Sequence, residues 1–259
     1  MKFVVVLPDG VSDVPLEILG GKTPLDVATH PNLDWIAREV RAREILFHTD
    51  AIASVGHVPV RVRELGVDAL SVAADQFGGP AGAAALYIKE GVRILPLLDG
   101  GGQETGGRSG TENLVGIIGM GVAAEAAAVQ LVQRADQERD LRDRLKAGLA
   151  QIPGVRFNGS QTARLPHNLH VCIDGISSES LVLGLDQAGI SVGIGSSCNS
   201  KAMRPSHVLK AIGFSDDQAQ GALVFTIGSH TTMEEIEAAL GIIPQVVMRL
   251  RNVTAVTVR

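Results

Sequence analysis

The chain has 259 residues, of which 45% are hydrophobic and 20% are charged, and its formal net charge is −5 at pH 7. This composition is typical of a folded globular protein with a substantial core and excludes a disordered chain. The 23 basic residues form no dense block, and one Trp, one Tyr and six Phe offer few stacking surfaces. Binding to nucleic acid is therefore not expected.

Short β-branched and aliphatic runs alternate with helical patterns along the chain. The first run, at residues 2–8, is too short for a signal peptide or a membrane span, so a cytoplasmic protein without a membrane anchor is expected. Further strands are expected at residues 44–50, 68–74, 84–88, 168–174, 190–195 and 222–228. This alternation predicts an α/β fold with a mostly parallel or mixed sheet.

Two helical patterns organise the second half of the chain. The longest runs from about Leu114 to Ile152, where residues of high helix propensity end at a Pro-Gly stop signal. A final amphipathic helix follows Thr232, whose hydroxyl is expected to cap it, with acidic residues in the first turn. The long helix is the natural division between two lobes, and the strands after Ile152 are expected to share one sheet.

The two cysteines have different sequence surroundings. They cannot build a disulfide framework, and no Cys/His cluster has the spacing of a zinc site. Cys172 lies in a strand pattern and is expected to be a buried apolar side chain. Cys198 lies in the Gly/Ser-rich stretch GIGSSCNS, where an accessible thiol could become a thiolate nucleophile. A lone cysteine is more often a small buried side chain, and the polar loop around Cys198 weakens that interpretation.

Four stretches carry a family resemblance: ILFHTDAIASVGHVPV, RELGVDALSVAADQFGGPAGAAALYI, LLDGGGQETGGRSGTENLVGIIG and ESLVLGLDQAGISVGIGSSCNSKAMRPSHVLKAIG. From about residue 43 to residue 251, the chain resembles the cysteine desulfurases, fold-type I enzymes that use pyridoxal phosphate (PLP) to take sulfur from L-cysteine. The resemblance implies a partial PLP-transferase large domain at residues 41–151. It also implies a smaller C-terminal α/β domain at residues 152–259, which carries the cysteine loop.

The resemblance implies roles for three residues. Cys198 matches the cysteine that attacks the PLP-bound substrate and carries a persulfide, and Asp50 matches the carboxylate that bonds the pyridinium nitrogen. Thr111 matches the threonine that reaches the PLP phosphate of the other subunit. The implied partners are a sulfur-acceptor or scaffold protein and a second subunit, in a homodimer or a heterodimer with a full-length desulfurase. Without the resemblance, Asp50 is a strand-end turn residue and Thr111 a helix N-cap.

The chain departs from the family pattern where cofactor and substrate are held. In AADQFGGPAG, Gln76 stands in place of the PLP-binding lysine, and a glutamine has no amine for a Schiff base. Asp75 replaces a histidine and brings a negative charge near the expected phosphate. Ser229 replaces the arginine that clamps the substrate carboxylate and offers no charged fork. Further departures are Ala53 for a glutamine and Ala73 for a serine. The N-terminal half of the family's large domain has no counterpart.

Residues 1–40 resemble a different family. The stretches PDG, LGGKTPL and HPNLDWIA are similar to the N-terminus of archaeal-type cofactor-independent phosphoglycerate mutases. Asp9 matches a metal ligand of that family, but one carboxylate does not make a two-metal site, so no metal is expected and Asp9 is interpreted as a turn residue. The sequence leaves open whether the strand at residues 2–8 joins the sheet of the following domain.

Three functions remain as hypotheses. The first is a cysteine-desulfurase-family protein that transfers sulfur through a persulfide on Cys198 and is degenerate because of Gln76. The second is a non-catalytic persulfide acceptor or a scaffold-binding module. The third, a metal-dependent phosphomutase, rests on residues 1–40 alone.

Overall fold

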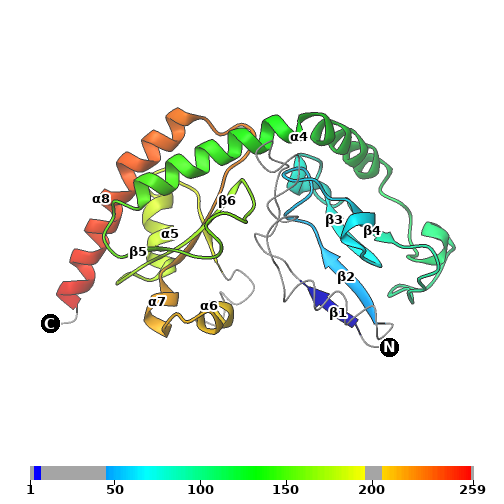
Figure 1. The fold of residues 1–259 in the computed structure, drawn as a ribbon, viewed down its shortest axis with the longest axis horizontal. Helices are drawn as coiled ribbons and strands as arrows, with labels where there is room; N and C mark the ends of the chain where they lie inside the picture. Colours follow the sequence, from blue (N-terminus) through cyan, green and yellow to red (C-terminus); the bar gives the residue numbers. More distant parts are fainter. Residues whose placement is uncertain (1–2, 7–44, 196–205, 258–259) are drawn as a thin grey trace. The chain divides into compact units, whose positions relative to one another are not determined.

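The structure of the chain is a computed structural model that describes residues 3–6, 45–195 and 206–257 (Figure 1). Asp9 and Cys198 lie outside these described residues. The chain divides into two compact units, Met1–Gln133 and Arg134–Arg259, and the division falls inside the long helix.

The first unit contains a four-stranded sheet in the order β1-β2-β3-β4. Its strands are β1 (Phe3–Val6), β2 (Leu46–Asp50), β3 (Ala69–Ala73) and β4 (Ala84–Ile88). The first three run parallel, and β4 is antiparallel to β3. These are the strands expected from the aliphatic runs. The sequence left open whether the first strand joins this sheet, and the pairing of β1 with β2 shows that it does.

The core of the first unit consists of two small clusters. One lies under the sheet around Phe47 and Leu70, and the other joins Ala74 and Phe77 to alanines of the long helix. Three short helical segments connect the strands and loops: α3 (Val62–Leu65), η2 (Ala74–Phe77) and η3 (Gln103–Gly106). Small residues form the second cluster because the loop after η2 passes close to the long helix. An added Cβ at Gly119 of this helix would lie 2.8 Å from Pro80.

The long helix α4 (Leu114–Leu149) forms as its composition predicts. The side chain of Asn113, not that of Thr111, caps its N-terminus, since Asn113 Oδ1 accepts a hydrogen bond from the Gly116 N–H at 3.0 Å. The interpretation of Thr111 as the N-cap is therefore wrong. Thr111 precedes the cap by two residues and is exposed.

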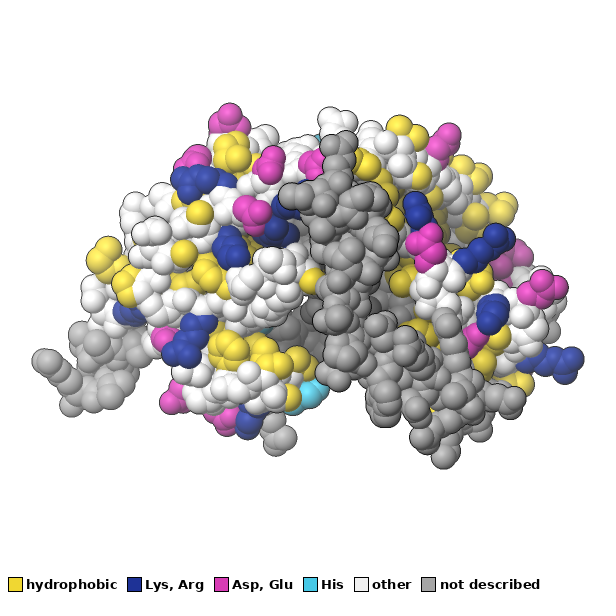
Figure 2. All heavy atoms as spheres, in the orientation of Figure 1, with side chains coloured by type: hydrophobic (Ala, Val, Ile, Leu, Met, Phe, Trp, Pro, Cys, Tyr) yellow, Lys and Arg dark blue, Asp and Glu magenta, His cyan; other side chains and the backbone are white. Residues whose placement is uncertain are grey.

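Much of the first half of α4 exposes aliphatic side chains, which Figure 2 shows as a gathering of apolar atoms. An 18-residue window of α4 has a mean hydropathy of 1.8 and is 17% buried, so by length and composition alone the helix is able to cross a membrane. Long core helices of soluble proteins pass the same test. The second half of α4 is different, because Leu141, Leu145 and Leu149 are buried in the core of the second unit.

The second unit contains a four-stranded sheet in the order β5-β6-β8-β7. Its strands are β5 (Val155–Phe157), β6 (Asn168–Ile173), β7 (Gly193–Ile194) and β8 (Ala222–Thr226), and every neighbouring pair is antiparallel. The three strands expected to share a sheet do so. Sequence patterns missed β5, because three residues are too few to show alternation.

Helices cover both faces of this sheet. They are α5 (Ser178–Asp186), α6 (His207–Ala211), α7 (Asp216–Gln220) and α8 (Met233–Thr257). The main core packs Leu169, Val171 and Ile173 of β6 against α4, α5 and α8. On the opposite face, Cys172 packs against residues of α6 and α7. The capping prediction for α8 is confirmed, because Thr232 Oγ1 accepts from the Glu235 N–H at 3.2 Å.

Candidate functional site

In the first unit, the carboxyl ends of β2 and β3 lie side by side, since Asp50 pairs with Ser71 in a parallel register. This edge of a parallel sheet is the usual place for a ligand in α/β folds. Asp50 ends β2, and its Oδ1 accepts a hydrogen bond from the Ile52 N–H at 2.9 Å. The neighbouring His48 Nε2 lies 2.7 Å from Ser71 Oγ. Asp50 therefore closes a strand-end turn through this oxygen.

The 3₁₀ segment η2 follows β3 directly and carries the two most informative departures. The Gln76 side-chain amide donates to Asp75 Oδ2 at 3.1 Å, and both residues are exposed. The backbone carbonyl of Gln76 lies 3.1 Å from Nε2 of the buried His57. The segment thus presents a neutral amide and a carboxylate at the strand end, with no nucleophilic amine.

The two most specific sequence motifs of the first unit are joined by hydrogen bonds. In GGGQE, Gln103 Oε1 accepts from the Gly110 N–H of RSGTEN at 3.3 Å. Ser109 Oγ donates to the carbonyls of Leu98 and Asp99, both at 3.0 Å. Thr111 lies in the loop that these bonds shape, next to the N-terminus of α4. Its side chain is exposed, which leaves it free to contact a ligand or another chain.

In the second unit, a polar cluster is formed by residues of β6 and the residue that follows β5. His170 and Cys172 alternate along β6 and so point to the same face of the sheet. The Asn158 side-chain amide lies 2.6 Å from His170 Nδ1 and donates to Cys172 Sγ at 3.2 Å. An added Cβ on Gly195, the last described residue before Cys198, would lie 2.2 Å from His170 Nε2. A side chain at this position would have to displace the imidazole.

Sequence reasoning missed His170 and Asn158. The two residues lie 12 positions apart, and their approach depends on the chain passing from β5 into β6. Strand alternation alone would have placed His170 on the face of Cys172, which is the one signal that was available. Ser229, which the resemblance places at the position of the substrate clamp, follows β8 as a half-buried residue. Ala53, in the first unit, is exposed.

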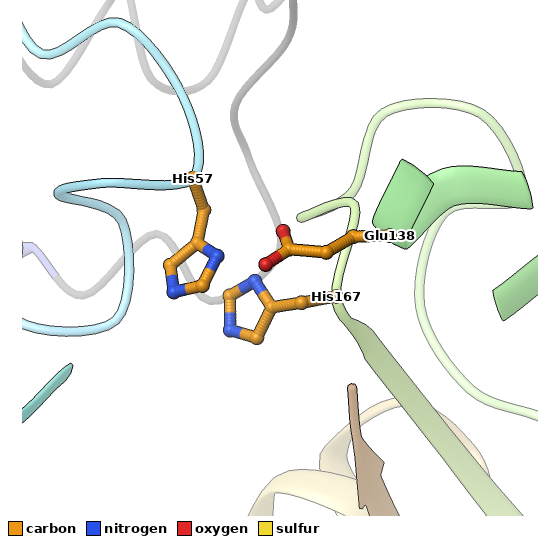
Figure 3. A group of neighbouring side chains, drawn as sticks. All are labelled: His57, Glu138 and His167. Carbon is orange, nitrogen blue, oxygen red and sulfur yellow. The ribbon is translucent and has the colours of Figure 1, made fainter. Parts of the chain in front are cut away.

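A second polar pair of this unit joins α4 to the start of β6. Glu138 and His167 are both buried, their potential ligand atoms lie within 4.8 Å, and Figure 3 shows the two side chains side by side. Within this unit the pair offers two ligand atoms, whereas zinc sites have about three or four protein ligands. Figure 3 also draws His57, which belongs to the first unit and is held there by Gln76.

Cys172 is a buried thiol, as the strand pattern predicts. Burial raises the pKa of the Cys172 thiol, and Asp174 adds to the rise; the Asn158 hydrogen bond and Arg156 oppose it. Because a thiolate is the reactive form, Cys172 is a poor nucleophile.

We expect Cys172 to stay protected from a disulfide reagent such as Ellman's reagent in the native protein at mildly alkaline pH, and to react only after denaturation. Titration of Cys172→Ala should give the parent number of thiols in the native state and one fewer in denaturant. Rapid native labelling that Cys172→Ala removes would show that the thiol is accessible.

The comparisons with known proteins all point to the same family. The sequence profile of the aminotransferase class-V family matches residues 29–239, so the match begins inside the segment that resembles the mutases. The cysteine desulfurase IscS of Methanosarcina thermophila is 41% identical over 232 residues, which are 90% of this chain and 57% of the relative.

Solved structures agree with the sequence comparison. A NifS-like protein shares 34% identity at a TM-score of 0.76 over 85% of this chain and 57% of its own. The NifS-like protein from Rickettsia africae shares 27% identity at a TM-score of 0.75 over 83% of this chain and 57% of its own. The chain thus spans little more than half the length of these relatives. It belongs to the aminotransferase class-V family, and the relatives that it matches there are cysteine desulfurases and NifS-like proteins.

Proposed function

We propose that this protein transfers sulfur through a persulfide on Cys198 and receives that sulfur from a donor persulfide, without generating it by PLP chemistry of its own. One observation carries the proposal. Gln76 stands where the family has its PLP lysine, and its amide is hydrogen-bonded to Asp75. The family's cofactor is PLP, and its covalent attachment requires an amine at this position.

The residues around Asp50 do not fit PLP as the family holds it. Asp50 remains to meet a pyridinium nitrogen, but Asp75 opposes a phosphate and Gln76 cannot form a Schiff base. Lys89 is the only lysine among the described residues of the first unit. It forms a salt bridge at 3.3 Å with Asp68, which precedes β3 and so lies at the opposite end of that strand from Gln76. No step of the proposed function passes through PLP.

The proposed transfer needs one nucleophilic thiolate and one donor persulfide whose outer sulfur is the electrophile. The Cys198 thiolate attacks the outer sulfur of a donor persulfide, a new S–S bond forms on Cys198, and the donor S–S bond breaks. The electron pair of the broken bond leaves with the donor thiolate, so no external oxidant or reductant is required. Cys172 does not compete, because burial raises the pKa of its thiol.

The partners follow from this chemistry. The donor is a persulfide made from L-cysteine by a full-length desulfurase, which forms a heterodimer with this chain or meets it transiently; a homodimer is the alternative. Thr111, exposed before α4, is proposed to contact the phosphate site of the other subunit. The sulfur then passes to an acceptor or scaffold protein, and the proposed compartment is the cytoplasm. A module that binds a scaffold without carrying sulfur is the second candidate.

The decisive experiment combines the protein with a working desulfurase, L-cysteine and a persulfide-selective label. Cys198→Ser should lose the label, and Cys172→Ala, the matched cysteine control, should retain it. After incubation with PLP and removal of unbound PLP, the protein alone should show no visible absorption band, and it should release no sulfide from L-cysteine. A PLP band with sulfide release would make it an autonomous desulfurase, whereas label that survives Cys198→Ser would reject Cys198 as the carrier.

A further inference from the structure

The imidazole of His170 lies against Gly195, the last described residue before Cys198. β8 separates β6 from β7 in the sheet, yet Nε2 of His170, on β6, is the atom that a side chain on Gly195 would meet first. Because Gly195 follows β7 directly, this contact requires the chain to turn from β7 back toward β6. The imidazole therefore limits how closely the chain approaches β6, just before the segment that carries Cys198.

Asn158 holds this imidazole from the other side. Its backbone N–H donates to the His170 carbonyl at 3.0 Å, and its side-chain amide nitrogen lies 2.6 Å from His170 Nδ1. The same amide also donates to Cys172 Sγ at 3.2 Å. Asn158 is 5% exposed, and Arg164 donates to its carbonyl, so its side chain has little freedom to turn.

The contact with Asn158 gives the imidazole one stable orientation. An amide N–H can only donate, so Nδ1 accepts and Nε2 carries the ring proton. A half-turn of the ring would put Cδ2 in the place of Nδ1, lose this hydrogen bond and move Nε2 away from Gly195. A side chain that is locked in this way can position its neighbour, because its own rotamer does not vary.

We propose that His170 is a positioning residue for sulfur transfer: its imidazole, locked by Asn158, is the stop against which Gly195 lies, and it fixes where the segment with Cys198 begins. The inference rests on the proposed function, in which Cys198 carries the sulfur. It adds that residues of β6 and of the turn after β5 govern the transfer through the position of the chain. A misplacement of about 1 Å can slow a reaction by about a hundredfold.

The first test is a double-mutant cycle on the rate at which Cys198 acquires a persulfide from a working desulfurase supplied with L-cysteine. Gly195→Ala and His170→Ala should each slow the transfer by about tenfold or more, since one displaces the imidazole and the other removes it. In the double variant the new methyl group occupies space that the imidazole has vacated. The two losses should therefore not multiply, and the rate should match that of His170→Ala.

Three further variants test the lock and the specificity of the effect. Asn158→Ala releases the imidazole but keeps both residues of the contact, so it should slow the transfer as His170→Ala does. Gly241→Ala adds the same methyl group inside α8, and His230→Ala removes an exposed imidazole after β8. Both controls should transfer at the parent rate. Circular dichroism checks that every variant is folded.

The second test separates positioning from a general loss of structure. Iodoacetamide is a small reagent that alkylates an accessible thiolate without docking. The alkylation rate of Cys198, measured with Cys198→Ser as the blank, should be the same in His170→Ala as in the parent. The persulfide donor is a protein that must dock, so only the transfer from this donor should slow.

A double variant that matches His170→Ala, together with an unchanged alkylation rate, supports the proposal. Losses that multiply, or transfer at the parent rate in His170→Ala, overturn it and leave Cys198 as the carrier. Equal losses of transfer and alkylation also overturn it, because His170 would then maintain the fold or activate the thiol. If Cys198 of the parent acquires no persulfide, the proposed function fails and the inference fails with it.

Discussion

Replacing Leu185 by alanine is expected to lower the free energy of unfolding of the second unit by about 2–5 kcal/mol. Leu185 is fully buried on α5, in the cluster that packs this helix against the sheet and α8. The truncation removes apolar contacts and leaves a cavity that the surrounding strands cannot close, since β6 and β8 are fixed by their ladder. β6 also carries His170 and Cys172, so this core supports the polar cluster beside Gly195.

Leu183→Ala is the matched control. Leu183 lies on the same helix and is 60% exposed, so its truncation should change the free energy of unfolding by no more than about 0.5 kcal/mol. Urea denaturation followed by circular dichroism measures both variants. Equal losses for the two leucines would contradict the burial pattern of α5.

The second large effect is expected at Gly221, where the chain leaves α7 and enters β8. An added Cβ there would lie 2.1 Å from the Ile173 carbonyl oxygen and 3.0 Å from that of Ile176. These are backbone atoms, and the Ile173 N–H already donates to the Gly221 carbonyl at 2.9 Å. Relief of the clash must move β6 away from β8. Gly221→Ala should therefore cost on the order of 3 kcal/mol, in the upper range for overpacking.

Gly241→Ala makes the same chemical change as Gly221→Ala but is expected to raise the stability of the protein. Gly241 lies inside α8, and an added Cβ there meets nothing within 4 Å. Alanine should stabilise the helix by about 0.5–1 kcal/mol because it loses less backbone freedom on folding. Thermal unfolding of the two variants should shift the midpoint in opposite directions. A stable Gly221→Ala protein would mean that the start of β8 can move.

The elements that sequence patterns predicted well are those with a strong local signal. The aliphatic runs gave β2, β3, β4, β6 and β8, and helix propensity gave α4. Thr232 caps α8 as expected, because a capping hydroxyl acts on an N–H only three residues away. The cap of α4 was placed wrongly at Thr111, since Thr111 and Asn113 are both good capping residues and only the backbone path selects between them.

The features of the candidate site also fall into two groups, those that residue type alone predicts and those that depend on the backbone path. That Gln76 has no amine, and that Ser229 has no charge, follows from residue type and needs no structure. The hydrogen bond from Gln76 to Asp75 and the contact of Gly195 with His170 depend on how the backbone turns after β3 and β7. Asn158 reaches His170 and Cys172 only because β5 and β6 pair in one register.

By itself, the sequence determined the α/β alternation, the positions of most helices and strands, and the lack of an amine in the side chain of Gln76, because each depends on residue types at short spacing. The tertiary structure decided that β1 joins the first sheet and that His170 stands against Gly195. Strand order and register decide these features, and both are set by packing between segments far apart in the chain.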